Sequence, residues 1–339
     1  MKKIINNKYF IIIPIIILNI ISLLYLYNSP YFTKHLIFIL ISITSLLTFS
    51  KINFKFFLKL IPIFYIISIL LLTLVLLIGK EINGAKAWIQ IFGISIQPSE
   101  LTKLALSMYV PYLTIKNKNI LYILLITIIP TFLTFLEPDT GAIIFYFIIF
   151  LSSLKYLKIN KKIMYTLLSV FILFIGINIF IYFTNQDLLI NIYGSKLFYR
   201  MDRLISFKKQ NNIQNINSLI SIGAHNLMYI PENHNDFIFA SIISKYSFSF
   251  PMIIICYIGI FIYYLNNVSN KKNISNIINI TILNTLLFQI FYNIFMNLSL
   301  VPIIGIPIPF LSYGGSYLVT LSALIGLSIN TKTNNNKVV

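Results

Sequence analysis

The sequence contains little charge, few acidic residues and almost no cysteine. Aspartate and glutamate account for eight of its 339 residues, and charged residues of all kinds for only 10%. With 58% hydrophobic residues and a mean hydropathy of +0.87, this composition indicates a protein that crosses a membrane several times. The single cysteine, Cys256, lies in an apolar run, so a disulfide framework is excluded.

Basic residues outnumber acidic ones and give a formal net charge of +18. No nucleic-acid-binding module is visible in the sequence. We therefore attribute this charge to membrane topology and to contact with the headgroups of anionic membrane lipids.

Apolar runs recur along the chain at lengths of roughly 17 to 25 residues, enough for a helix to cross the hydrocarbon core. They predict an all-α polytopic membrane protein with about ten transmembrane helices, forming a single domain over residues 1–339. The predicted spans cover residues 9–27, 36–49, 56–78, a helix that begins at Pro98, then 120–136, 141–157, 163–183, 237–265, 274–300 and 311–329. A large outer loop over about residues 185–236 separates the seventh span from the eighth. The first span resembles a signal peptide but lacks a small-residue cleavage site, so we expect it to stay as an anchor.

Charge predicts how the spans are oriented. If the N-terminus lies inside, sixteen of the 26 basic residues fall on the inner side, nearly all in short loops, as the positive-inside rule requires. Both termini are therefore expected in the cytoplasm. The acidic residues all fall on or near the outer face: Glu81, Glu100, Glu137, Asp139, Asp187, Asp202, Glu232 and Asp236. Because acidic residues have little influence on insertion, their one-sided placement indicates that the chemistry of the protein faces outward.

Two acids and a histidine stand close together just before the eighth span, at Glu232, His234 and Asp236. One interpretation is that Asn235 or Asp236 caps the helix that follows, since either side chain can accept a hydrogen bond from a free amide of the first turn. The other is that Asp236 faces a substrate at the membrane surface as a catalytic base. These residues alone leave both interpretations open.

A second polar cluster precedes and enters the fourth span. Trp88, the only tryptophan, lies beside Lys86 in an amphipathic stretch typical of the membrane interface. Pro98 is expected at the first position of a helix and Glu100 in its first turn, where a carboxylate suits the helix dipole. Glu100 and Lys103 lie on one helix face and can pair. Ionisable groups inside a span usually face a protein interior or a wet cavity, although a purely structural ion pair is the alternative.

The turn between the fifth and sixth spans contains Glu137, Pro138 and Asp139, and Asp139 is expected to cap the sixth helix. The ninth span carries a polar stripe of Gln289, Asn293 and Asn297, four residues apart, which should face inward.

A proline-rich segment joins the ninth and tenth spans. Three prolines between residues 302 and 309 prevent a regular helix, and irregular backbone at membrane depth requires surrounding protein or a wet cavity. Gly314, Gly315 and the hydroxyls of Ser312 and Ser316 would let backbone amides approach an anion such as a pyrophosphate.

Five ordered motifs in this sequence resemble the SEDS (shape, elongation, division and sporulation) family. They are Gly84-Ala85-x-x-Trp88, Gln97-Pro98-Ser99-Glu100-x-x-Lys103, Pro138-Asp139-x-Gly141, Pro231-Glu232-x-His234-x-Asp236-Phe237-Ile238-Phe239-Ala240 and Pro307-x-Pro309-x-x-Ser312-Tyr313-Gly314-Gly315-Ser316. The resemblance covers essentially the whole chain. The segment Pro302-Ile303-Ile304-Gly305-Ile306-Pro307 is more similar to the rod-shape branch, RodA, than to the division branch, FtsW.

The resemblance implies a peptidoglycan glycosyltransferase at the outer face of the bacterial plasma (inner) membrane, acting in cell elongation and rod shape. Its substrate would be lipid II, an undecaprenyl-pyrophosphate-linked disaccharide-peptide, and its partner a class B penicillin-binding protein that acts as transpeptidase. Catalytic roles map onto Asp236, Glu100 and Lys103. Substrate-binding positions are predicted at Lys86, Trp88, Gln97, Ser99, Asp139, Glu232, His234, Asn293, Ser312, Tyr313, Gly314, Gly315 and Ser316.

Elementary chemistry agrees with this implication. Sugar transfer needs a base for the acceptor hydroxyl, and a positioned carboxylate suits that role. Charge that grows on the leaving pyrophosphate could be offset by Lys103, by the loop of residues 312–316, or by a divalent cation such as Mg²⁺ or Mn²⁺. The sequence assigns no ligands to such a cation.

The sequence departs from the family pattern in the outer loop and near two motifs. The glycine-rich segment that family members usually carry before the Pro-Glu-x-His motif is reduced here to residues 222–229. Three single positions also differ from the family pattern: Glu137 stands where Gln is usual, Asn233 where Arg is common, and Asn235 where Thr is usual. We expect the outer loop of residues 185–229 either to close over substrate less well or to be remodelled around the partner, and activity to be retained because the catalytic positions are intact.

Two other functions are alternatives, a lipid II flippase or other transporter, and a non-catalytic scaffold for the transpeptidase. Transport predicts ionisable residues through the membrane depth, and a pure scaffold predicts loss of Asp236 or Glu100.

Overall fold

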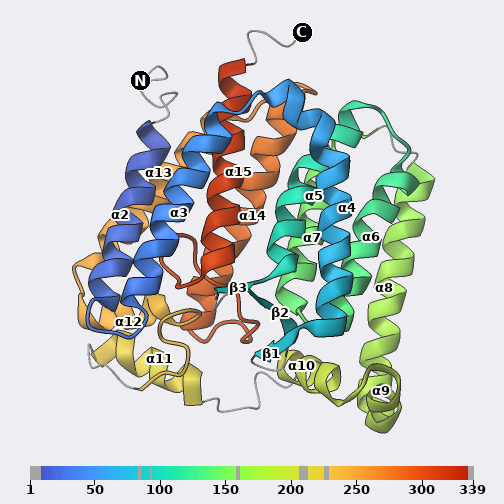
Figure 1. Cartoon of the computed structure of the whole chain (residues 1–339). Coiled ribbons are helices and arrows are strands. Elements are labelled where there is room, and N and C mark those ends of the chain that lie inside the picture. The colour runs from blue at the N-terminus through green and yellow to red at the C-terminus, as the bar shows by residue number, and fades with distance from the viewer. Residues whose placement is uncertain are drawn as a thin grey trace.

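The computed structural model describes residues 9–82, 85–91, 94–157, 161–205, 213–224 and 229–334. Long helices run up and down in a bundle, and α2 begins at the same end of the bundle at which α15 ends (Figure 1). The long helices are α2 (Tyr9–Leu26), α3 (Phe32–Lys51), α4 (Phe54–Ile78), α5 (Pro98–Ile115), α6 (Ile120–Leu136), α7 (Thr140–Leu154), α8 (Lys161–Thr184), α13 (Ser249–Asn267), α14 (Ile274–Asn297) and α15 (Gly315–Asn334). Within the described ranges, α2, α3, α4, α13 and α14 are long and apolar enough to cross a membrane, and α6, α7 and α15 are shorter apolar helices. The all-α polytopic prediction is confirmed.

The predicted eighth span is wrong in one respect, because two helices occupy it. A short α12 (Ile238–Lys245) is followed by Tyr246, whose backbone is not helical (φ −136°, ψ 81°), and α13 begins three residues after Tyr246, at Ser249. The Ser249 hydroxyl donates a hydrogen bond to the Tyr246 carbonyl at 2.6 Å and stabilises the break. The sequence marks the break with the polar residues Ser244, Lys245 and Ser247, which the single predicted span over residues 237–265 passed over.

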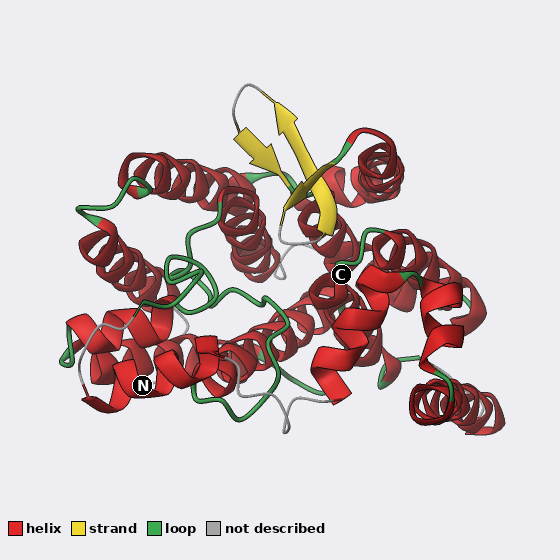
Figure 2. Ribbon diagram, turned by 90° about the horizontal axis from the view of Figure 1, so that it is seen from below, coloured by secondary structure: helices red, strands yellow, loops and turns green. Residues whose placement is uncertain are grey.

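A small antiparallel sheet, which the sequence reading did not predict, lies between α4 and α5. Its strands are β1 (Lys80–Ile82), β2 (Ala85–Ile91) and β3 (Ile94–Ile96), in the order β1-β2-β3. Ala87 and Ile89 are buried, while Trp88 between them and Gln90 after them are more exposed, which is the period-two alternation of a strand. Viewed along the bundle, the sheet extends to one side (Figure 2).

The sheet lies at one end of the bundle together with the short helices of the outer loop (Figure 1). These are α9 (Gln186–Tyr193), α10 (Ser195–Ile205) and α11 (Ile213–Ala224). The turn between α6 and α7 and the segment before α12 are at this end too. All eight acidic residues therefore fall in the part of the bundle opposite the start of α2.

Helices α3 and α15 pack in especially close contact. A β-carbon at Gly326 of α15 would lie 2.5 Å from the Leu46 carbonyl oxygen of α3, and one at Gly315 would lie 2.6 Å from the Phe38 ring. Glycine at these two positions is what allows the helices to approach so closely.

Candidate active site

The segment of residues 230–237 forms a tight loop before α12. Its backbone is folded by hydrogen bonds from the amides of Asn235 and Phe237 to the Glu232 carbonyl, at 3.0 and 3.2 Å. Glu232 adopts a left-handed conformation, with φ of 59°. Such a conformation is costly for a non-glycine residue and indicates that its surroundings hold the loop in one shape.

The interpretation of Asp236 or Asn235 as a helix cap is wrong. Phe237 occupies the N-cap position of α12 and makes no side-chain capping bond. The free Ala240 amide instead donates to the Oδ1 of Asn297, which comes from α14, at 3.0 Å. Oδ1 of Asp236 is buried and has no hydrogen-bond partner among the described residues.

The electrostatics of Asp236 suit proton transfer. Burial, with a smaller contribution from the neighbouring Glu232 charge, raises the pKa of Asp236 to about 7. A carboxyl group titrating near neutral pH can take up a proton and release it again. Gly305 lies beside this carboxyl, because a β-carbon at Gly305 would be 3.4 Å from Oδ2 of Asp236.

Two asparagines hold the backbone of Asp236. Its carbonyl accepts hydrogen bonds from the side-chain amides of Asn293 at 2.9 Å and Asn297 at 3.1 Å. Gln289, Asn293 and Asn297 are all buried, which confirms the predicted inward-facing stripe on α14.

The proline-rich segment runs alongside the Asp236 loop and is bonded to the same stripe. Gln289 donates to the Pro307 carbonyl at 2.9 Å, and Asn293 donates to the Ile306 carbonyl at 2.7 Å. The Tyr313 amide donates to the His234 carbonyl at 2.9 Å. The two loops are therefore fixed to each other and to α14.

His234 lies between aromatic rings. Its imidazole stacks on Tyr31 with ring centroids 4.0 Å apart, and Tyr313 lies 5.7 Å away on an edge. Burial lowers the pKa of His234, opposed by the Glu232 carboxylate 3.8 Å from its Nε2. Tyr31 belongs to no motif in the sequence, so its place here could not be anticipated.

The start of α5 is bonded to the turn before α7. Pro98 and Glu100 occupy the first turn of α5, as predicted. Gln97 and Ser99 each donate a side-chain hydrogen bond of 2.8 Å to Oδ2 of Asp139. Asp139 accepts the Ala142 amide at 3.2 Å through Oδ1, which confirms it as the cap of the sixth predicted span.

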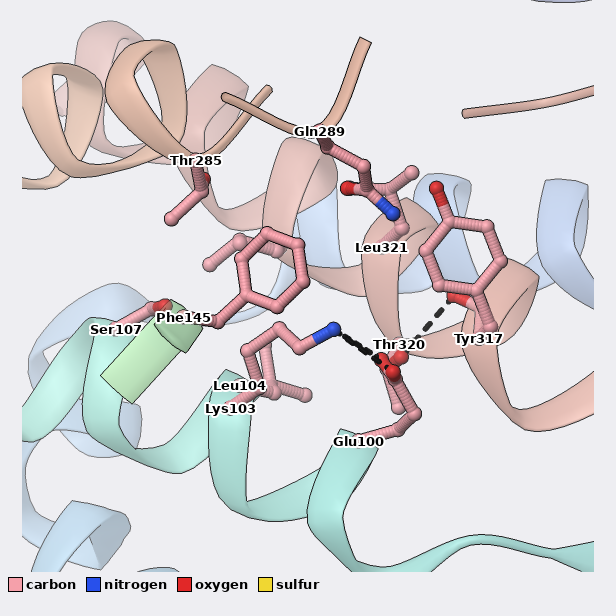
Figure 3. A pocket seen from close by; sticks show the side chains of 11 residues that line it. Glu100, Lys103, Leu104, Ser107, Phe145, Thr285, Gln289, Tyr317, Thr320 and Leu321 are labelled. Carbon is pink, nitrogen blue, oxygen red and sulfur yellow. Dashed lines mark hydrogen bonds and ion pairs between the residues drawn. The ribbon is translucent and has the colours of Figure 1, made fainter. Parts of the chain in front are cut away.

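Glu100 and Lys103 face each other at a small cavity (Figure 3). The Lys103 ammonium also lies 4.2 Å from the centroid of the Phe145 ring. The cavity holds about 20 Å³, room for one or two water molecules. Its lining combines α5, α7, α14 and α15 through Glu100, Lys103, Leu104, Ser107, Phe145, Thr285, Gln289, Tyr317, Thr320, Leu321 and Leu324.

Several residues predicted to bind substrate make structural contacts. Ser312 donates to the Asn235 carbonyl at 2.7 Å and accepts the Ile308 amide at 2.8 Å. Ser316 accepts the Gln97 amide and donates to the Ser95 carbonyl, both at 3.1 Å. Both hydroxyls thus join loops to one another.

Lys86 and Trp88 lie on strand β2. The Lys86 ammonium donates to the last carbonyls of α4, those of Leu76 at 2.7 Å and Leu77 at 3.1 Å. Gly84 and the loop remnant at residues 225–228 lie outside the described residues.

The structure thus brings the predicted residues into two neighbouring groups. One surrounds Asp236 and contains Glu232, His234, Asn293, Ser312 and Tyr313. The other surrounds Glu100 and contains Gln97, Ser99, Lys103 and Asp139. Gly305 lies between them, since its carbonyl oxygen is 3.8 Å from a β-carbon position at Gly141, next to Asp139.

The sequence assigns no ligands to the predicted divalent cation. In the described ranges, no three or more histidine, cysteine or acidic side chains are grouped to hold a metal ion. We therefore assign no step to a metal.

Comparison with known proteins gives consistent matches over nearly the full length. Residues 5–337 match the family model FTSW_RODA_SPOVE, described as "Cell cycle protein". The probable peptidoglycan glycosyltransferase FtsW of Buchnera aphidicola subsp. Baizongia pistaciae is 30% identical over 332 residues, covering 88% of this chain and 83% of that protein. The protein of the same name from Haemophilus influenzae is 28% identical, covering 89% of this chain and 81% of its own length.

Two solved structures share the fold. One, described as "Structural coordination of polymerization and crosslinking by a peptidoglycan synthase complex", has a TM-score of 0.80 at 19% identity and covers 98% of this chain and 99% of its own. The other, Thermus thermophilus rod shape determining protein RodA, has a TM-score of 0.69 at 18% identity, with 97% of both chains covered.

Proposed function

Because the chain belongs to the FTSW_RODA_SPOVE family of cell cycle proteins, we propose that it is a peptidoglycan glycosyltransferase that polymerises lipid II. Its relatives in Buchnera and Haemophilus are both named probable peptidoglycan glycosyltransferase FtsW. The acidic residues gathered at one end of the bundle favour this function over transport, which needs ionisable groups through the membrane depth.

Asp236 is the base in this proposal. The acceptor sugar hydroxyl attacks the anomeric carbon of the donor, the bond from that carbon to the pyrophosphate oxygen breaks, and the hydroxyl proton passes to the Asp236 carboxylate. The unpartnered Oδ1 is the single observation that carries this assignment, because a buried acceptor without a partner is available to a substrate. A pKa of about 7 keeps much of the group ionised at neutral pH.

Positive charge near the leaving group would come from α5 and α15. Lys103 is held by Glu100, so its ammonium has a fixed place from which to offset charge on the pyrophosphate. Helix α15 begins at Gly315, and the amides of its first turn lie at the positive end of the helix dipole, which favours anions.

The setting in the cell completes the proposal. We place the acidic end outside the bacterial inner membrane, with both termini in the cytoplasm and a class B penicillin-binding protein as partner. The rod-shape role follows from residues 302–307 alone, while the curated relatives carry the division name FtsW. The choice between elongation and division therefore stays a prediction.

The test is polymerisation of purified lipid II by the purified protein, with and without its transpeptidase partner. Asp236→Asn should abolish glycan synthesis, because an amide cannot take up the proton, while expression and folding are unchanged. Asp187→Asn makes the same chemical change on exposed α9 and should leave synthesis intact. Full activity of Asp236→Asn in folded protein would contradict the proposal.

A further inference from the structure

Asn297, the last residue of α14, is fully buried and uses every polar group that it has. Its side-chain amide donates to the Asp236 carbonyl at 3.1 Å and to the Asn293 carbonyl at 2.9 Å. Its side-chain oxygen accepts the Ala240 amide of α12 at 3.0 Å. Its main-chain carbonyl accepts the Ser218 hydroxyl of α11 at 2.7 Å.

This residue replaces a local helix cap with a long-range one. A helix start normally takes its capping oxygen from the residue just before it, so that loop and helix move together. Here the oxygen that caps α12 comes from 57 residues later in the chain, and the same side chain holds the Asp236 carbonyl. The position of Asp236 relative to α12 is therefore set by α14.

Two anchors are needed to fix the carboxyl group. A single hydrogen bond to the Asp236 carbonyl would leave the peptide free to rotate about it. Asn293 and Asn297 bond that carbonyl from successive turns of α14 and bond each other at 3.1 Å, so the peptide has one orientation. Asn293 also bonds the Ile306 carbonyl, whereas Asn297 bonds to α11, to α12 and to the Asp236 loop.

We propose that Asn297 is a positioning residue for the transfer reaction, fixing the Asp236 carboxyl at the distance and angle that proton transfer requires. This inference rests on the proposed function. Because the buried side chain of Asn297 already bonds to protein through both its amide and its oxygen, we assign its effect to Asp236 and not to substrate contact. Its loss should lower kcat and leave KM for lipid II nearly unchanged.

The experiment compares two buried asparagines of α14. Asn297→Ala should lower kcat by roughly 10- to 100-fold, the usual effect of misplacing a catalytic group, with KM changed by less than about threefold. Asn279, buried on the same helix, accepts a hydrogen bond from Ser328 and lies about 27 Å along the helix from Asn297. Asn279→Ala should keep kcat near the wild-type value. An equal fall in kcat in both variants would overturn the proposal, because it would show that removing any buried asparagine of α14 disturbs the packing.

A second variant covers the case in which Asn297→Ala folds poorly. Asn297→Asp keeps the oxygen that accepts the Ala240 amide but loses the N–H groups that hold the Asp236 carbonyl. The Asn297→Asp variant should show the same fall in kcat as Asn297→Ala. If either variant folds and keeps the wild-type kcat, the proposal is overturned. If Asp236→Asn abolishes synthesis while Asn297→Ala does not affect it, only this inference fails. Activity in Asp236→Asn would instead contradict the proposed function itself.

Discussion

The ammonium of Lys103 lies 2.7 and 2.9 Å from the two carboxylate oxygens of Glu100, one turn earlier on α5. Neither side chain is more than 13% exposed, and the ammonium also faces the Phe145 ring. Such a pair, desolvated within a helix bundle, needs both partners, because an unpaired charge left there is costly.

Exchanging the two charges separates a structural pair from a functional one. The double variant Glu100→Lys with Lys103→Glu keeps an ion pair, and we expect it to fold. It moves the positive charge one turn along α5 and removes the cation from Phe145, so polymerisation should fall at least ~100-fold. Purified protein with normal thermal stability and wild-type turnover would refute the catalytic assignment of this pair.

The burial of Glu137 should make the stability of the fold depend on pH. Glu137 is fully buried, neither carboxyl oxygen has a partner in the described structure, and burial, with the nearby Asp139 charge, raises its pKa from 4.5 to about 9. Between these values the folded protein holds a proton that the unfolded chain releases, so the free energy of unfolding falls as pH rises.

Glu137→Gln removes this dependence, because glutamine has the same shape and does not titrate. The variant should gain stability over wild type between pH 5 and pH 8, by up to about 1.4 kcal/mol per pH unit. Unfolding in detergent micelles at the two pH values measures the difference. Parallel stability curves for the two proteins would show that Glu137 is solvated or paired in solution.

The close contact between α3 and α15 should exclude any side chain at position 326. A β-carbon there would lie 2.5 Å from the Leu46 carbonyl, so Gly326→Ala must separate the helices, at a cost of about 1–3 kcal/mol. The control is Gly176→Ala on α8, where nothing lies within 4 Å of the added carbon and the helix should gain roughly 0.5–1 kcal/mol. Thermal unfolding should shift in opposite directions for the two variants, and an unchanged Gly326→Ala would contradict the close contact.

The orientation in the membrane predicts which positions a thiol reagent can reach. On a Cys256→Ser background, a membrane-impermeant reagent should label Asn233→Cys from outside intact cells, and Asn273→Cys only after the membrane is opened. Asn233 lies in the Asp236 loop, and Asn273 begins α14 at the opposite end of the bundle. Labelling with reversed sidedness would defeat the polymerase proposal, because the sugars of lipid II are polymerised outside.

Properties that depend on neighbouring residues were predictable from the sequence. The long apolar helices, the first turn of α5, the Glu100–Lys103 pair and the Asp139 cap all follow from spacing of a few residues. The inward stripe on α14 follows from helical periodicity in the same way.

Features that depend on distant partners were not predictable. The cap of α12 comes from Asn297, and the ring against His234 comes from Tyr31, both far away in the chain. Local propensity therefore offered Asn235 or Asp236 as the cap, beside the catalytic interpretation of Asp236, and indicated no role for Tyr31. The break between α12 and α13 has a local signal in Ser244, Lys245 and Ser247, but these polar residues stand within a longer apolar run. The strands of the small sheet have 3, 7 and 3 residues, and such short strands in an amphipathic stretch give little periodic signal.

The attachment of the Asp236 loop also has a consequence for biosynthesis. Its anchors Asn293, Asn297 and Ser312 follow the loop by 57, 61 and 77 residues. At ordinary rates of translation, several seconds pass between synthesis of the base and synthesis of the groups that hold it. A nascent chain that has inserted only its first eight spans therefore has Asp236 but no ordered active site. The enzyme acquires its working arrangement only when its last two helices are in the membrane, so an incomplete chain cannot begin polymerisation.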